Sequence, residues 1–389
     1  MSGWGAAVRQ EWDLDPAFLT VNHGSYGATP RVVLAAQREW QRRMEAQPVR
    51  FFGREAAPAL RAAAGRLAAF VGARSDDLVF IENATAGCNT VLRALDFAAG
   101  DEILVLSHGY GAVTKAARYV ASRTGARVVE APVPFPRADE DALVAAVVGA
   151  ITPRTKLALL DHITSGSALV LPMARLTAAC HVAGVPVLVD GAHAPGNLDL
   201  DVPATGADWY VGNCHKWLCA PKGCAFLWVQ PERQAGLHPL VISHGYGQGF
   251  LAEFDWIGTR DISAWLAVTA ALDFHERLGG SGLRARNRAL AAEAATMLAG
   301  RFGTETGLGN GAPQAMALVR LPIAGDAPPG GAPALWQRTL DLGTDAQLPE
   351  LGGAIWLRIS AQAYNTLDDY ERLADLLTAE LSQAPLASN

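Results

Sequence analysis

Short apolar runs alternate with longer amphipathic stretches through residues 78–229. The runs have the length and composition of buried strands, and several are followed by a stretch with helical spacing. The predicted strands are 78–81, 103–106, 127–130, 156–160, 185–189, 209–211 and 223–229. One predicted helix follows the first strand and ends at residue 95, and further helices are predicted at about 112–123, 139–150 and 174–183. Strands that are apolar throughout and alternate with helices indicate a mainly parallel sheet covered on both faces.

The flanking segments predict helices before this region and a smaller unit after it. Residues 30–72 carry helical spacing, with Pro48 and Pro58 as breaks. Later helices are predicted at about 262–278, 284–300 and 367–377, with a strand at 354–359 and a Gly- and Pro-rich surface loop at 325–333. The pattern divides the chain into a large unit, residues 1–258, and a smaller C-terminal α+β unit, residues 259–389.

Composition narrows the class of protein. The 389 residues are 50% hydrophobic and carry a net charge of −6, with no basic block that indicates nucleic-acid binding. The N-terminus lacks the pattern of a signal peptide, and no apolar stretch reaches the ~18 residues of a membrane span. Five cysteines, an odd number, favour reduced thiols and a cytoplasmic location. The spacing of Cys214, Cys219 and Cys224 matches no standard metal site, so no metal is predicted.

Polar side chains follow the ends of several predicted strands, where ligands bind in sheets of this kind. Lys216 stands in a mostly apolar stretch, and Asp190 ends a strand 26 residues before it. A lysine so placed can hold a carbonyl cofactor as a Schiff base, while the acid holds the cofactor's ring nitrogen. An aspartate at a strand end is also a common helix N-cap, so Asp190 has a purely structural alternative.

Four segments resemble the fold-type I pyridoxal phosphate enzymes of the class V aminotransferase family, and most of all its isopenicillin N epimerase-like group. They are Asp190-Gly191-Ala192-His193-Ala194-Pro195-Gly196, Gly212-Asn213-Cys214-His215-Lys216-Trp217, Asn22-His23-Gly24-Ser25-Tyr26-Gly27 and Trp356-Leu357-Arg358-Ile359-Ser360. The resemblance implies an α/β fold of the PLP-transferase type, with a mainly parallel seven-stranded sheet in a large domain and a smaller C-terminal α+β domain. It also implies pyridoxal 5′-phosphate as cofactor, an amino-acid substrate and a homodimer with sites at the subunit interface.

The resemblance assigns roles to residues that bind the cofactor. Lys216 is expected to form the Schiff base and to move protons at Cα, and Asp190 to pair with the pyridine nitrogen. His193 is expected to contact the phenolic oxygen. The phosphate cradle is expected at the start of the helix after residues 78–81, where backbone N–H groups suit a phosphate. Its predicted members are Thr85, Ala86, Asn213 and His215, with Thr259 reaching the phosphate of the neighbouring subunit.

The same resemblance assigns the substrate side. Tyr110 is expected to stack on the ring, with His108 as the alternative stacking residue. For epimerisation, either Tyr110 or a water is expected to return the proton to the other face of Cα. Arg358 is expected to bind the substrate α-carboxylate through a bidentate fork, and a surface arginine at a strand edge is the structural alternative. Asn22, Ser25 and Tyr26 are expected to line the entrance for the substrate.

Two departures from the cysteine desulfurases of this family narrow the reaction. Residues 338–357 contain no cysteine, so transfer through an enzyme persulfide is not predicted. Ser165 stands where desulfurases place an asparagine near the substrate carboxylate. The predicted reaction is epimerisation at Cα, and the alternative is a C–S lyase reaction, β-elimination from cysteine, an S-substituted cysteine or its sulfoxide. Transamination is a third reading, and a non-enzymatic PLP-binding protein is disfavoured because lysine, acid and arginine occur together.

Overall fold

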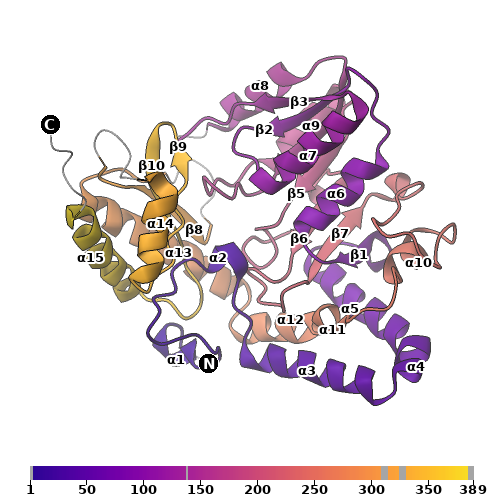
Figure 1. Ribbon diagram of the computed structural model, residues 1–389, viewed down its shortest axis with the longest axis horizontal. Helices are drawn as coiled ribbons and strands as arrows, with labels where there is room; N and C mark the ends of the chain where they lie inside the picture. Colours follow the sequence, from indigo (N-terminus) through magenta and orange to yellow (C-terminus); the bar gives the residue numbers. More distant parts are fainter. Residues whose placement is uncertain (1–2, 137–138, 308–313, 324–329, 384–389) are drawn as a thin grey trace.

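The protein is built around a seven-stranded sheet that is parallel except for one strand (Figure 1). A computed structural model describes residues 3–136, 139–307, 314–323 and 330–383. The strand order is β1-β7-β6-β5-β4-β2-β3, and only β7 runs antiparallel to its neighbours. The strands are β1 (Leu78–Ile81), β2 (Glu102–Leu106), β3 (Arg127–Ala131), β4 (Thr155–Asp161), β5 (Val187–Asp190), β6 (Trp209–Asn213) and β7 (Ala225–Val229). The mainly parallel α/β fold predicted from the sequence is therefore confirmed.

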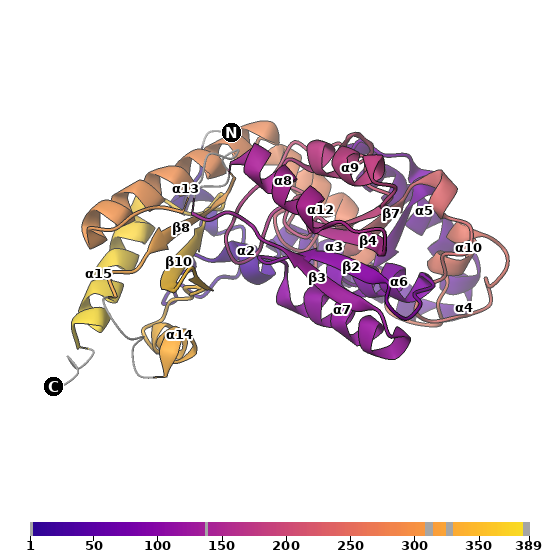
Figure 2. The same ribbon diagram turned by 90° about the horizontal axis from the view of Figure 1, so that it is seen from above.

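Helices cover both faces of this sheet because its strands carry apolar side chains on both sides. On β4, Leu157 and Leu159 point to one face while Ala158 and Leu160 point to the other. The first face packs on α6 (Ala84–Ala94), α7 (Gly111–Thr124) and α10 (Phe250–Asp255). The second packs on α3 (Arg31–Ala46), α5 (Ala56–Phe70), α8 (Glu140–Ala150), α9 (Met173–Val182), α11 (Ser263–Leu266) and α12 (Val268–Arg277). Figure 2 shows α8 and α9 on one side of the sheet and α7 on the other.

The C-terminal part forms a second, smaller α+β unit with its own core. Its antiparallel sheet has the order β8-β10-β9, and α13, α14 and α15 accompany it. Leu19 and Val21, from the start of the chain, pack into this core. The elements are β8 (Met316–Arg320), β9 (Glu350–Leu351), β10 (Ala354–Ser360), α13 (Ser281–Phe302), α14 (Gly331–Asp341) and α15 (Leu367–Gln383). The N-terminal segment also holds α1 (Ala6–Arg9) and α2 (His23–Tyr26), and α2 lies between the two units (Figure 1).

The boundary between residues 258 and 259 stays a prediction. α11 and α12 follow it in sequence but share the core of the large unit, where they pack on α3 and α5. This packing favours a later division, near the start of α13.

Several elements differ from those expected. β8 and α14 were not predicted. Within the expected Gly- and Pro-rich loop, residues 330–333 precede or begin α14. The other residues of that loop, 325–329, lie outside the described part of the chain. Pro58 does not interrupt a helix, because it stands in the first turn of α5, where helices tolerate proline. Pro48 opens the short α4 (Pro48–Arg50), which continues into a π-helical turn, Phe51–Glu55. None of the helices in the described residues has the length and apolarity needed to cross a membrane.

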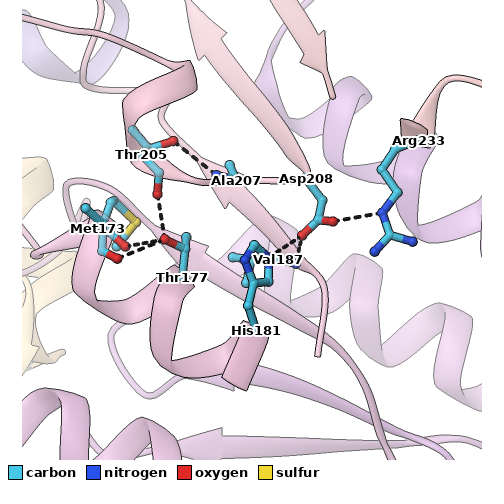
Figure 3. Close-up of polar contacts among 9 residues, drawn as sticks. Met173, Thr177, His181, Val187, Thr205, Ala207, Asp208 and Arg233 are labelled. Atoms are coloured by element: carbon cyan, nitrogen blue, oxygen red, sulfur yellow. Dashed lines mark hydrogen bonds and ion pairs between the residues drawn. The ribbon is translucent and has the colours of Figure 1, made fainter. Parts of the chain in front are cut away.

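A buried polar network fixes the amino-terminal ends of β5 and β6 (Figure 3). The carboxylate of Asp208, just before β6, accepts hydrogen bonds from Arg233 Nε at 2.8 Å and from the main-chain N–H of Val187 at 2.7 Å. It also lies 2.8 Å from Nε2 of His181 on α9. Asp208 thus joins β5, β6 and α9 at the amino-terminal ends of these strands, away from their carboxyl ends.

Candidate active site

A cavity of about 530 Å³ opens at the carboxyl ends of the central strands. β1, β4, β5 and β6 all lead into it, as expected for ligand sites in parallel sheets. The predicted site residues that line it are Ser25, Tyr26, Thr85, Tyr110, Asp190, His193, Asn213, His215 and Lys216. Segments that are far apart in the sequence therefore meet in one place.

Lys216 lies buried in the loop after β6, beside His193. Its Nζ is 3.0 Å from His193 Nε2, and the indole N–H of Trp217 donates to His193 Nδ1 at 3.3 Å. The bond from Trp217 favours the tautomer with the proton on Nε2, which suits an uncharged amine at Lys216. Burial, reinforced by the charge of Arg358, lowers the pKa of Lys216 to about 8. Lys216 is thus partly neutral near physiological pH, as a nucleophile or base must be.

Asp190 ends β5 with its side chain buried at the cavity. Its Oδ1 accepts a hydrogen bond from the main-chain N–H of Ala192 at 3.0 Å, so it does cap the turn that follows the strand. Burial raises the pKa of Asp190, and the positive charge of Lys216 opposes this shift. A buried carboxylate that faces a cavity is stabilised by a cationic ligand group. The protonated ring nitrogen of pyridoxal phosphate is such a group, so the site fits the predicted cofactor.

The start of α6 is held in place by two asparagines. The side chain of Asn83 accepts from the N–H of Ala86 at 2.9 Å, and that of Asn213 accepts from the N–H of Ala84 at 2.9 Å. Asn213 therefore contacts the helix start, and Ala86 is absent from the cavity lining given by the described residues. Thr85, between the two occupied N–H groups, faces the cavity at the positive end of the helix.

Arg358 projects from β10 of the small unit and is almost completely buried. Its guanidinium donates to the carbonyl of Ser165 at 2.6 Å, to Asn22 Oδ1 at 2.8 Å and to Ser25 Oγ at 2.9 Å. Its Nε has no hydrogen-bond partner within the described ranges. Burial lowers the pKa of Arg358 to about 10, which still leaves it charged at neutral pH. The side chains of Asn22 and Ser25 orient the guanidinium.

The structure distinguishes the two candidates for the stacking residue. Tyr110 lines the cavity and is 43% exposed. His108 turns away, with Nδ1 2.9 Å from Ser167 Oγ and its ring packed edge-on against Phe135. This arrangement favours Tyr110. Thr259, by contrast, is exposed and stands outside the cavity lining found in the described residues, so its expected contact with a neighbouring subunit stays a prediction.

Three charged residues of the cavity were missed by the sequence analysis: Asp161, Lys222 and Glu82. Asp161 ends β4 as Asp190 ends β5, so the same strand-end signal could have identified it. Lys222 follows Lys216 by six positions, and its Nζ donates to the carbonyl of Gly27 at 2.8 Å. Glu82 pairs with Arg260. Glu82 directly follows β1, so the strand-end signal could have identified it too, whereas nothing in the local sequence marks Lys222.

Comparisons with known proteins agree with this geometry. A family model described as aminotransferase class-V matches residues 26–328. The chain is 36% identical to isopenicillin N epimerase of Amycolatopsis lactamdurans, over 97% of this chain and 98% of that protein. It is 35% identical to putative L-cysteine desulfhydrase 1 of Oryza sativa subsp. japonica, over 95% of this chain and 85% of that protein.

Among solved structures, the cystine C–S lyase C-DES in complex with cysteine persulfide is similar in fold. It superposes with a TM-score of 0.79, at 21% identity, and covers 92% of this chain and 97% of its own. At this level of identity the likeness concerns the fold, which is the fold type predicted from the sequence.

Proposed function

We propose that this chain, which belongs to the class V aminotransferase family, is an epimerase that inverts Cα of an amino-acid substrate. The protein is a pyridoxal 5′-phosphate enzyme. Lys216, Asp190, His193 and Thr85 are the residues that would hold the cofactor. When bound, pyridoxal phosphate supplies an electron sink for the charge left at Cα after a proton is removed.

The protein's own residues bind the substrate and move the proton at Cα. Arg358 binds the α-carboxylate and so fixes which bond of Cα faces Lys216. Lys216 takes the Cα proton, and its contact with His193 keeps the amine oriented. The observation that carries the proposal is a pair of features. Lys216 is a buried amine with a pKa of about 8 in the cavity, and Arg358 is a buried guanidinium bonded to Ser165 and Ser25 of the cavity lining, with an Nε that has no partner in the described residues.

Inversion needs a second proton donor opposite Lys216, and Tyr110 is the candidate. Its ring lines the cavity, and its main-chain N–H is held by Asp161 Oδ1 at 3.1 Å. A phenol is a suitable donor because it can give and regain a proton within one turnover. The match to isopenicillin N epimerase over nearly the full length of both chains supports the same reading.

A C–S lyase reaction is the second candidate, and the similarity to L-cysteine desulfhydrases favours it. β-Elimination begins with the same removal of the Cα proton by Lys216, so the residues around the cofactor serve both reactions equally. The two differ in the next step: elimination expels a sulfur group from the β-carbon, whereas epimerisation returns a proton to the other face.

Two assays separate these candidates. The purified enzyme is incubated with α-amino acids in deuterium oxide, and the label at Cα and both enantiomers are measured. In parallel, S-substituted cysteines are supplied and pyruvate is assayed. The proposal predicts labelled substrate of both configurations, and pyruvate without any racemised substrate would exclude the epimerase.

The Lys216→Ala variant is the control for both assays. It should lose turnover altogether, because no other amine in the described cavity is equally buried beside His193. Full activity in this variant would exclude the proposed role of Lys216.

The assembly and location follow as parts of this proposal. We propose a homodimer, because the loop between β7 and α10 exposes a run of large apolar side chains, and such patches mark interaction surfaces. Its exposed members are Leu240, Val241, Ile242 and Tyr246. All five cysteines are buried and free, which supports a reducing compartment such as the cytoplasm.

A further inference from the structure

Two aspartates end neighbouring strands of the large sheet. Asp161 is the last residue of β4 and Asp190 the last of β5, and the strand register pairs them directly. Paired residues on parallel strands point to the same face. Leu159 and Leu188, two positions earlier on each strand, both pack toward α6 and α7, so the two carboxylates also lie on that face. The mechanism above gives a role to Asp190 and uses Asp161 only to hold a main-chain N–H.

Asp161 has one oxygen engaged and one that is not. Its Oδ1 accepts from the main-chain N–H of Tyr110 at 3.1 Å, at the start of α7. Its Oδ2 is buried and has no hydrogen-bond partner in the described parts of the chain, although the residue lines the cavity. The side chain is only 2% exposed, so water does not solvate this oxygen freely. A buried ionised carboxylate left in this state is strongly disfavoured, whereas a protonated one is disfavoured much less because it carries no charge.

The surrounding charges favour protonation of Asp161 over Asp190. Burial and the neighbouring Asp190 raise the pKa of Asp161 well above its ordinary value, although the hydrogen bond from Tyr110 and the charge of Lys216 act in the opposite direction. The other titratable groups facing the pair are Lys216, the phenol of Tyr110, Cys88 on α6 and Tyr210 on β6; burial and the charge of Asp190 raise the pKa values of Cys88 and Tyr210. Two adjacent buried carboxylates do not both ionise readily, so a single proton distinguishes them.

We propose that Asp161 is a positioning residue that acts in its protonated form. It leaves Asp190 as the one anion that faces the ring nitrogen of the cofactor, and it fixes Tyr110 above the same ring through the main chain. The proton on Oδ2 also turns an unpartnered acceptor into a donor at the edge of the cavity. This inference rests on the proposed role of Asp190 toward the cofactor.

Replacement of Asp161 by its neutral isostere tests the protonated state. In Asp161→Asn, the amide oxygen still accepts from Tyr110 and the amide N–H replaces the carboxyl O–H. The absorption maximum of bound pyridoxal phosphate, the midpoint of its pH titration and the cofactor affinity are then measured. All three should stay close to wild type, with the affinity within about twofold. A shift of the titration midpoint by about one pH unit or more would show that a negative charge was removed, and would overturn the proposal.

Asp161→Ala tests the positioning role. It removes the hydrogen bond to Tyr110 and the neutral donor together, so the cofactor affinity should fall by about tenfold, and Asp161→Asn should restore it. An alanine variant with wild-type spectrum and affinity would overturn the proposal.

Asp208→Asn provides a matched control. Asp208 is also a buried, hydrogen-bonded aspartate, but it lies at the amino-terminal ends of β5 and β6, away from the cavity. It should lower the thermal stability and leave the cofactor spectrum unchanged. A wild-type protein that gains no absorption from added pyridoxal phosphate would overturn the proposed function itself, and this inference with it.

Discussion

The protonation of Lys216 sets how the apo-protein captures its cofactor. With a pKa of about 8 rather than 10.5, about a tenth of the amine is neutral at pH 7, instead of about one part in three thousand. The rate of capture of added pyridoxal phosphate should therefore rise about tenfold per pH unit below pH 8 and level off above it. Stopped-flow absorbance measures this rate. A rise that continues to pH 10 would mean that burial does not lower the pKa of Lys216 in the folded protein.

Arg358 should control affinity for the substrate carboxylate. Arg358→Ala removes a buried charge with a free N–H, so binding of α-amino acids should weaken by about 2–4 kcal/mol, seen as a raised KM. Binding of the corresponding amino-acid amides should change much less. Arg320→Ala is the control, because Arg320 lies on the adjacent β8 in an exposed ion pair with Glu305. An unchanged KM for α-amino acids would remove Arg358 from the site.

The sequence indicated which residues form the site better than it indicated how their side chains are arranged. Lys216, Asp190 and His193 stand in recognisable motifs, and the structure brings them into one cavity. Asp161 stands at a strand end as Asp190 does, but its proximity to Asp190 depends on the register of β4 and β5, which the sequence of either segment does not show. Asn22 and Ser25, predicted at the substrate entrance, both accept hydrogen bonds from Arg358, and among the described residues Ser25 lines the cavity while Asn22 does not.

Among the elements, those with clear periodicity were predicted, whereas β8 and α14 were not. The strands of the large sheet are short apolar runs, and each begins and ends within a few residues of its predicted position. The start of α14 was read as part of a loop, because Gly330, Gly331 and Pro333 stand there. Proline in the first turn lacks only an N–H that has no helical partner in any case, so it permits the helix. The position of a proline, which the sequence does not reveal by itself, decides its effect.

The Asp208 network should determine how firmly β5 and β6 are held. Asp208→Ala leaves Arg233, His181 and the N–H of Val187 without their shared acceptor (Figure 3). Arg233 and His181 are 44% and 42% exposed, so water compensates part of the loss, and the unfolding free energy should fall by about 1–3 kcal/mol. Urea denaturation measures the change. Asp199→Ala is the control, because Asp199 pairs with Arg284 while its side chain is 63% exposed, and it should cost no more than about 1 kcal/mol.

The whole molecule explains why the site needs both units. The large sheet supplies Lys216 and Asp190, whereas Arg358 comes from the small sheet, and Ser25 of the intervening α2 touches Arg358. The N-terminal segment packs into the small unit through Leu19 and Val21. If Arg358 holds the carboxylate of the substrate and the large unit holds the cofactor, substrate binding depends on the relative position of the two units. This arrangement follows from the tertiary structure, and the sequence indicated it only through the order of its motifs.

The proposed homodimer can be tested at the exposed loop between β7 and α10. Ile242 is 57% exposed there, among other apolar side chains, and a charge at its position should disfavour burial against a second copy. Ile242→Glu should shift the protein from dimer to monomer in light-scattering measurements. It should also weaken cofactor binding, because Thr259 would no longer reach the neighbouring phosphate. Val182→Glu is the control: Val182 is 91% exposed at the end of α9, and the dimer should persist. A dimer that survives Ile242→Glu would place the interface elsewhere.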